Sequence, residues 1–497
     1  MLEVKKIFYT AVLALCAMVG VGCLITVALM VFTMNKVTFL CWLVSGVAVV
    51  LFYKMFYSLT EFWLPMLKPY RLWLLVFLGF LASVVIDMVL VFGFGQAMVS
   101  DFKAAQHCVE AGIPKIWHVG MASHWKIYEL LISFIGSVTH PSLLTAQLIN
   151  SVCISAVIYP VYKIAFRISG THVAILVSTF LAFSPTILLY GSFLTSEFLC
   201  ATFMMYAFYV CTLIKIDSSS FIRKNILFIF GAAILLVIAD FFKPLGVIFI
   251  GASIMYGILF LILWCRDWRY VVRMLIIGCI FITVYKISQR EFRVVIERLC
   301  PEEGQIQYRT GVHWYGLMVG LSGDSGVYTA EISKFAQSLT PEESKKYLIK
   351  QIKCEWRKMP KLFAKKFARL YWSDRWVCGW LAQTIESFHG VRPCLLTGLT
   401  VGWYFNVVLF FGAGIFGVVV MCLKRQGGVG AGVFSLLVIL GFTILILLIE
   451  VQARYRMSVY PFYFAILPYA AKLKSFTGTK DFISCFKVSL KKTTKSN

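Results

Sequence analysis

Long runs of apolar residues alternate with short polar turns along most of the chain. Each run is about 20 residues long, which is the length that an α-helix needs to cross about 30 Å of hydrocarbon. The pattern predicts an all-α polytopic membrane protein with about twelve transmembrane helices. Their approximate cores are 8–32, 37–56, 72–94, 143–162, 171–190, 196–214, 225–242, 245–264, 272–288, 397–422, 431–450 and 457–471.

One short turn carries an acidic residue between two of these apolar runs. Its sequence is Tyr190-Gly191-Ser192-Phe193-Leu194-Thr195-Ser196-Glu197, which has no room for a domain. Glu197 is therefore expected at or near a membrane surface, where an ionisable residue costs about 2.5–3.5 kcal/mol if it is fully inserted. We expect a partner to hold this carboxylate in place.

Two longer polar segments divide the chain. Residues 1–288 form an N-terminal transmembrane region that includes a loop at 95–142. Residues 289–396 form a second loop, the only region polar enough for a small helical domain outside the membrane. Residues 397–471 form the C-terminal transmembrane helices, and residues 472–497 form a basic tail.

The second loop contains two amphipathic patterns. Thr340-Pro341-Glu342-Glu343 predicts a helix start with an N-cap, a first-turn proline and a capping-box glutamate. The following helix is expected to place Tyr347, Leu348, Ile352 and Trp356 on one face and to break at Pro360. The next segment is expected to have two faces. Its apolar face holds Leu362, Phe363, Phe367 and Leu370, and its cationic face holds Lys361, Lys365, Lys366 and Arg369.

Composition agrees with a membrane protein. Of the 497 residues, 60% are hydrophobic and the mean hydropathy is +0.83, which excludes an ordinary soluble domain. In a soluble protein, the formal net charge of +24 would suggest a nucleic-acid partner. Here we expect no nucleic acid, because lysines and arginines anchor cytoplasmic loops and contact anionic lipid.

The distribution of basic residues predicts an orientation. If the N-terminus is cytoplasmic, one set of short connections holds most of the lysines and arginines, among them Lys54, Lys68, Arg71, Lys163, Arg167, Lys215, Arg223, Lys224, Arg266, Arg269, Arg273, Lys424 and Arg425. Such an excess is typical of the cytoplasmic side. We therefore expect a multi-pass protein of the plasma (inner) membrane with both termini in the cytoplasm and both long loops outside.

Several charged residues then fall on the outer side. Asp101 follows the third apolar run, Glu197 and Lys243 lie in tight turns, and Arg454 and Arg456 precede the last run. Each has a simpler explanation on its own, because terminal lysines and arginines snorkel to headgroups and a carboxylate stabilises a helix N-terminus. Their shared side favours one polar site at the outer boundary.

Other familiar chemistries lack their sequence patterns. There is no phosphate-binding Walker loop, and the glycines near 316–326 have no strand–helix–strand context. His107, His118, His124 and His140 show no metal-ligand spacing, so no metal site is predicted and no cofactor is assigned. A need for a divalent cation stays open.

The order of these features resembles GT-C fold integral-membrane glycosyltransferases. The resemblance rests on Asp101 at the start of the first outer loop, Thr195-Ser196-Glu197, Phe242-Lys243-Pro244, Arg454-Tyr455…Pro461…Pro468 and His313-Trp314-Tyr315-Gly316-Leu317. The nearest relatives would be the family 39 type, protein O-mannosyltransferases and the lipid A aminoarabinose transferase. Many of these carry an acidic pair where this chain has Asp101-Phe102-Lys103 and then Glu110, which suggests a divergent bacterial branch.

The resemblance implies transfer of a sugar from a polyprenyl-phosphate donor to a lipid, cell-envelope glycan or protein acceptor, with inversion. It implies that Asp101 is the catalytic base and that Glu197 orients the acceptor, the sugar or a cation. Lys243, Arg454 and Arg456 would bind the donor phosphate. Three further residues would contact substrate, namely Glu110, Tyr455 and His313.

Three other functions fit parts of the pattern. A transporter or flippase also needs many helices and buried charges, but often shows internal repeats, which this sequence lacks. A polysaccharide polymerase or ligase would have a similar outer loop and would use diphosphate-linked chains. A membrane scaffold would disperse its charged residues around the lipid-facing perimeter.

Overall fold

The computed structural model describes ten ranges of the chain and a few single residues. The ranges are 70–98, 123–138, 143–215, 221–263, 268–299, 341–371, 375–385, 412–422, 430–449 and 451–473, and the single residues are Val47, Gln106, Leu317, Leu321, Phe335 and Leu339. Every regular element within these ranges is a helix, as the sequence predicts. The first two expected spans lie outside these ranges, and Val47 is the one residue of them that the structure describes.

Five stretches are long and apolar enough to cross a membrane. They are Leu72–Gly93, Leu143–Ala182, Asn225–Phe242, Trp268–Val295 and Gly430–Leu448. Three shorter apolar helices accompany them, Glu197–Cys211, Gly246–Leu261 and Gly412–Cys422. All eight coincide with expected apolar runs, which supports a multi-pass membrane protein. The number of twelve spans remains a prediction.

The first described helices form a bundle whose chain direction reverses at glycine. α3 (Arg71–Met88) continues into a π-helical turn, η1 (Val89–Gly93), and α6 (Leu143–Ala156) is followed by α7 (Ile158–Ala182). Gly170, with φ of 80°, divides α7 into two helices. Because L-residues rarely adopt positive φ, glycine is the residue that permits this reversal.

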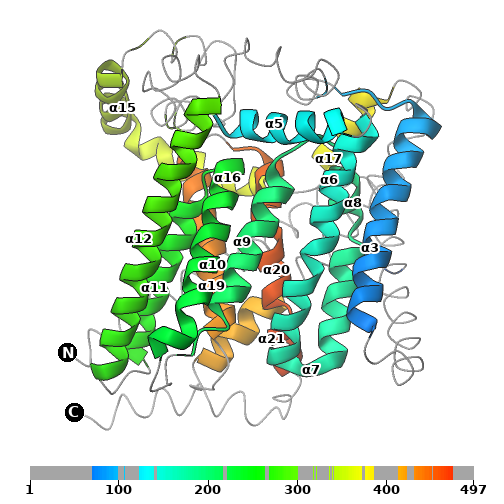
Figure 1. Ribbon diagram of the computed structural model, residues 1–497. Helices are drawn as coiled ribbons and strands as arrows, with labels where there is room; N and C mark the ends of the chain where they lie inside the picture. Colours follow the sequence, from blue (N-terminus) through cyan, green and yellow to red (C-terminus); the bar gives the residue numbers. More distant parts are fainter. Residues whose placement is uncertain are drawn as a thin grey trace.

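The middle of the chain forms the remaining walls of the bundle. α8 (Pro185–Gly191) leads through a short turn into α9 (Glu197–Cys211), followed by α10 (Phe221–Phe242), α11 (Gly246–Leu263) and α12 (Trp268–Leu299). α9 and α10 pack side by side, and α12 packs on α10. α5 (Ser123–Val138) lies across one end of the bundle, roughly perpendicular to α10 and α12 (Figure 1).

The helices of the second loop lie at the same end as α5 (Figure 1). They are α15 (Pro341–Glu355), the 3₁₀ turn η3 (Trp356–Lys358), α16 (Met359–Tyr371) and α17 (Arg375–Thr384). α15 begins at Pro341 as predicted. The break comes at η3, just before the predicted break at Pro360.

In α15, the face predicted to hold Tyr347, Leu348, Ile352 and Trp356 is mostly exposed, and only Leu348 of these four is buried. The prediction for α16 was wrong in one detail. Lys366, predicted on the cationic face of α16, has no exposed surface. Its ammonium instead reaches backbone carbonyls at the end of α19 (Gly430–Leu448), which places it inside the packed structure.

The last helices complete the bundle. α19 is followed by the 3₁₀ segment η5 (Ala453–Val459) and the short helices α20 (Tyr460–Ile466) and α21 (Pro468–Leu473). α20 packs against α19 and α7. At one end of the bundle, Ser169 beside Gly170 donates a hydrogen bond to the Pro468 carbonyl at 2.8 Å. At the other, η5 packs on α9 near Glu197. We call these the Gly170 end and the Glu197 end.

Candidate functional site at the Glu197 end

The turn before Glu197 is held by amide side chains from α6. Asn150 Nδ2 donates to the Gly191 and Phe193 carbonyls at 2.9 and 2.6 Å, and Gln147 Nε2 donates to the Ser192 carbonyl at 2.7 Å. All these groups are buried, so each backbone oxygen would otherwise lack a partner away from water. The α8–α9 turn is therefore fixed by α6.

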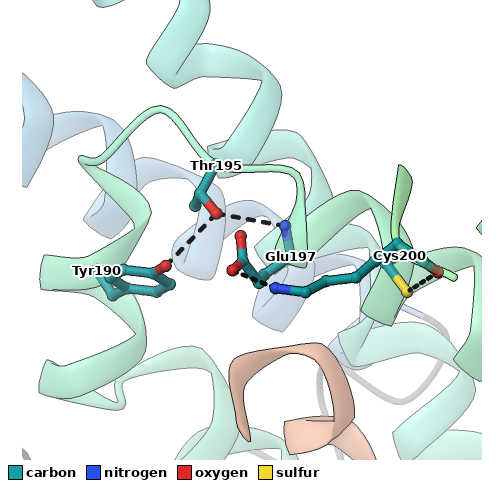
Figure 2. Close-up of polar contacts among 5 residues, drawn as sticks. Tyr190, Thr195, Glu197 and Cys200 are labelled. Carbon is teal, nitrogen blue, oxygen red and sulfur yellow. Dashed lines mark hydrogen bonds and ion pairs between the residues drawn. The ribbon is translucent and has the colours of Figure 1, made fainter. Parts of the chain in front are cut away.

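Glu197 begins α9 and forms a buried ion pair. Its Oε1 lies 2.6 Å from Nζ of Lys243, and Figure 2 draws this ion pair as a dashed line from Glu197. Lys243 is in the turn between α10 and α11. The Glu197 side chain is 2% exposed and the Lys243 side chain 16%. A buried carboxylate needs such a partner, because its desolvation alone is costly. The expectation that a partner holds Glu197 is confirmed.

Thr195 contacts the backbone of Glu197 at the start of α9. Its hydroxyl accepts from the Glu197 backbone N–H and lies within hydrogen-bond distance of Tyr190 Oη, both at 3.4 Å (Figure 2). Among the described residues, the other carboxylate oxygen of Glu197, Oε2, is buried and has no hydrogen-bond partner. Oε2 therefore retains the capacity to accept a hydrogen bond.

Residues of η5 bring aromatic and cationic groups to the pair. The ring of Tyr455 lies 4.4 Å from Nζ of Lys243, and Cζ of Arg454 lies 5.7 Å from the same ring. Cζ of Arg454 also lies 5.9 Å from the ring of Trp380 in α17. Both distances to Arg454 are within the range of cation–π attraction. Glu197, Lys243, Arg454 and Tyr455, predicted on one side of the membrane, thus lie together.

Arg456 occupies a different position from Arg454. It is buried, and its Nη1 donates to the Leu370 carbonyl near the end of α16 at 3.0 Å. Lys366 of α16 in turn donates to the Leu447 and Ile449 carbonyls. Cations near a helix C-terminus satisfy its last carbonyls. These two side chains therefore join α16 to the membrane bundle beside the ion pair, and phosphate binding by Arg456 remains a prediction.

The cluster formed by Glu197, Lys243, Arg454 and Tyr455 carries a net positive charge. Burial lowers the pKa of the Lys243 ammonium, and the adjacent Glu197 carboxylate opposes that effect. Arg454, close enough to lower the same pKa, adds a second positive charge against one carboxylate. A site with two buried cations and one anion favours an anionic ligand.

The loop predicted at 95–142 starts next to the Glu197–Lys243 ion pair. Gln96 Nε2 lies 3.3 Å from Ser192 Oγ, Gln96 Oε1 accepts from Gln147 at 3.0 Å, and the Ala97 N–H donates to the Thr384 carbonyl at 2.8 Å. Gln96 precedes Asp101 by five residues, which reach at most roughly 17 Å. Asp101 lies outside the described residues, as do Glu110 and His313.

Sequence reasoning missed the residues that support the site. Gln147 and Asn150 read as polar interruptions of an apolar run, although their i, i+3 spacing places them on one helix face and could have indicated a shared partner. Trp380 carried no pattern that linked it to Arg454. The described residues contain no group of three His, Cys, Asp or Glu that could hold a metal ion.

No family model and no curated protein sequence matches this chain. Two solved structures of Archaeoglobus fulgidus oligosaccharyltransferase resemble it at 12% identity. One is a complex with Zn and sulfate (TM-score 0.46, covering 83% of this chain and 51% of that one). The other, named AglB, is bound to an inhibitory peptide and a dolichol-phosphate (TM-score 0.45, covering 85% and 54%). This chain spans about half their length, and at these TM-scores the likeness does not establish a common fold.

Proposed function

We propose that the protein is a membrane glycosyltransferase that moves a sugar from a polyprenyl-phosphate donor to an acceptor at the extracytoplasmic face. The observation that carries the proposal is the buried cluster of Lys243, Arg454, Glu197 and Tyr455, which three separate inter-helix connections bring together at the Glu197 end. The resemblance of the sequence to GT-C glycosyltransferases of the family 39 type agrees with this site.

The cations suit the phosphate of a lipid-linked donor. The Lys243 ammonium has three donors, of which Glu197 takes one, and its side chain is 16% exposed, so a ligand can reach it. The guanidinium of Arg454 can approach a phosphate bidentately. Tyr455 and Trp380 beside Arg454 offer flat faces for a sugar ring. A polyprenyl tail would lie in the surrounding bilayer.

The transfer itself needs one base and one leaving group. The acceptor oxygen or nitrogen attacks the anomeric carbon, and its proton passes to the Asp101 carboxylate. The bond from the anomeric carbon to the phosphate oxygen breaks, and the electron pair stays on the phosphate. Lys243 and Arg454 stabilise that developing charge. A single displacement inverts the anomeric configuration and releases polyprenyl phosphate.

Glu197 serves this reaction in two ways. Through Oε1 it holds the Lys243 ammonium charged and oriented, and through the buried Oε2 it can accept a hydrogen bond from the acceptor or the sugar. Arg456 extends the phosphate contacts, while Glu110 and His313 contact substrate from the outer loops. The acceptor is a lipid, an envelope glycan or a protein.

Donor turnover tests the proposal. Purified wild-type protein and the Asp101→Asn variant are given a panel of polyprenyl-phosphate sugars, with a crude envelope extract as acceptor. We expect release of polyprenyl phosphate that requires the extract and disappears in Asp101→Asn. The variant should still bind polyprenyl phosphate, because its phosphate contacts are intact.

Other outcomes would support the rival functions. Turnover of diphosphate-linked chains alone would favour a polymerase or ligase. Donor that is bound and moved across vesicles with its glycosidic bond intact would favour a transporter. Folded protein that neither binds nor cleaves any polyprenyl-phosphate sugar would overturn the proposal.

A further inference from the structure

The Lys243 turn is closed by a carboxylate that the proposed reaction does not use. Asp240 lies near the C-terminal end of α10, and its Oδ1 accepts from the backbone N–H of Gly246, the first residue of α11, at 2.6 Å. A carboxylate is unfavourable near a helix C-terminus and favourable at a helix N-terminus. Asp240 therefore links the end of one helix to the start of the next across the turn that carries Lys243.

Two side chains of α12 hold Asp240 in this position. Tyr285 Oη donates to Asp240 Oδ2 at 2.6 Å, and Gln289 Nε2 donates to the same oxygen at 3.1 Å. Tyr285 is buried, and Gln289 also lies 3.4 Å from its hydroxyl. Among the described residues, the donors to Asp240 thus come from α11 and from α12, which packs against α10.

The turn leaves little freedom to the Lys243 backbone. The Lys243 N–H donates to the Ala239 carbonyl at 3.0 Å, the Lys243 carbonyl accepts from Leu245 at 2.7 Å, and Cys200 Sγ lies 3.7 Å from the same carbonyl (Figure 2). A Cβ on Gly246 would lie 2.6 Å from Tyr285 Oη and 2.9 Å from Asp240 Oδ1. Glycine at 246 is therefore what lets Asp240 and Tyr285 approach the turn.

We propose that Asp240, held by Tyr285 and Gln289, is a positioning residue that fixes the Lys243 turn and thereby sets the affinity of the site for the donor phosphate. This inference rests on the proposed function and assigns to α12 a part in that site. Without the Tyr285 hydroxyl, the Asp240 carboxylate is held less firmly, so the Lys243 ammonium samples more positions. The contacts of this ammonium with phosphate are then broken more often than its ion pair with Glu197.

The test is a double-mutant cycle between Tyr285 and Lys243. The dissociation constant for polyprenyl phosphate in detergent micelles is measured for wild type, Tyr285→Phe, Lys243→Met and the double variant. Tyr285→Phe removes one hydroxyl and should weaken binding about ten-fold. In the Lys243→Met background the same change should have no further effect, because the group that it positions is gone.

A matched control separates positioning from general destabilisation. Tyr206 Oη donates to the Ala156 carbonyl at 3.0 Å, away from the turn, so Tyr206→Phe removes a comparable hydrogen bond. We expect wild-type affinity from Tyr206→Phe. Gln289→Met should weaken binding in the same direction as Tyr285→Phe. An equal loss from Tyr285→Phe with and without Lys243, or no loss at all, would overturn the inference.

A second readout keeps this inference separate from the proposed function. Amide hydrogen exchange of the segment 240–248 is compared in wild type, Tyr285→Phe and Tyr206→Phe. We expect faster exchange of the Gly246 amide in Tyr285→Phe alone. If wild type binds no polyprenyl phosphate, the proposed function fails, while unchanged exchange in Tyr285→Phe would refute the positioning of the turn itself.

Discussion

Cationic side chains lie at both ends of the helix bundle, but their exposure and their partners differ. At the Gly170 end, Arg167 is exposed, lies over the ring of Tyr209 at 5.5 Å and donates to Thr212 Oγ1 at 3.0 Å. At the Glu197 end, Lys243 is mostly buried against a carboxylate, and Arg454 is buried beside two aromatic rings. The first arrangement is that of a side chain that snorkels to a membrane surface.

The difference separates anchoring from binding. An exposed lysine or arginine at a helix end loses little hydration, whereas a buried cation loses several kcal/mol and needs compensating partners. A chain that only needed anchors would have no reason to bury Lys243, Arg454, Arg456 and Lys366 at one end. We therefore expect substitutions at the Glu197 end to have large effects and those at the Gly170 end small ones.

The largest effect is expected from breaking the ion pair. Glu197→Gln leaves the Lys243 ammonium buried without a carboxylate and should lower stability by about 3–5 kcal/mol. The midpoint of thermal unfolding in detergent measures it. Lys243→Met in the same chain should restore part of the loss, because it removes the uncompensated charge. A double variant as unstable as the sum of the two single variants would contradict a direct pair.

The next effect tests the attachment of α16. Lys366→Met removes the charged donor from the Leu447 and Ile449 carbonyls and should cost about 1.5–3 kcal/mol. Lys361→Met, at an exposed position of the same helix, is the matched control and should leave the unfolding midpoint unchanged. Equal midpoints for both variants would mean that the buried position of Lys366 is incorrect.

A smaller effect is expected where the Gly170 end depends on backbone shape. Gly170 has φ of 80°, and no heavy atom lies within 4 Å of the place that a Cβ would take, so Gly170→Ala meets strain but no clash. The cost should be about 1–2 kcal/mol. Gly251→Ala, in α11 and equally open, is the matched control and should not lower the midpoint of thermal unfolding.

The smallest effect belongs to the exposed cation. Arg167→Gln should change stability by less than about 0.5 kcal/mol, because surface substitutions rarely do more. Thermal unfolding in the same detergent gives the comparison. A loss as large as that of Glu197→Gln would erase the distinction between the two ends.

The sequence predicted which residues of the site lie on the same side of the membrane. Apolar run lengths and the asymmetry of basic residues placed Glu197, Lys243 and Tyr455 on one side, and the structure brings them into contact. Contacts between distant segments were not readable. Asn150 binds the Gly191 and Phe193 carbonyls across more than forty positions of sequence, and no local pattern encodes that distance.

Lys366 shows a second limit of pattern reasoning. Its place in an amphipathic helix predicts exposure, because three other cations share that side of α16. The pattern cannot show that the carbonyls at the end of α19 lie within reach of this one ammonium. Tertiary partners therefore decided the burial of Lys366. They also hold Asp240, which is half-buried and whose donors come from α11 and α12.

The most direct test of the account compares phosphate binding at the two ends. The dissociation constants of polyprenyl phosphate and of the uncharged polyprenol are measured for wild type, Lys243→Met and Arg167→Gln. We predict that wild type prefers the phosphate, that Lys243→Met weakens its binding about ten-fold or more, and that Arg167→Gln does not. Equal binding of phosphate and polyprenol, or equal losses in the two variants, would contradict a phosphate site at the Glu197 end.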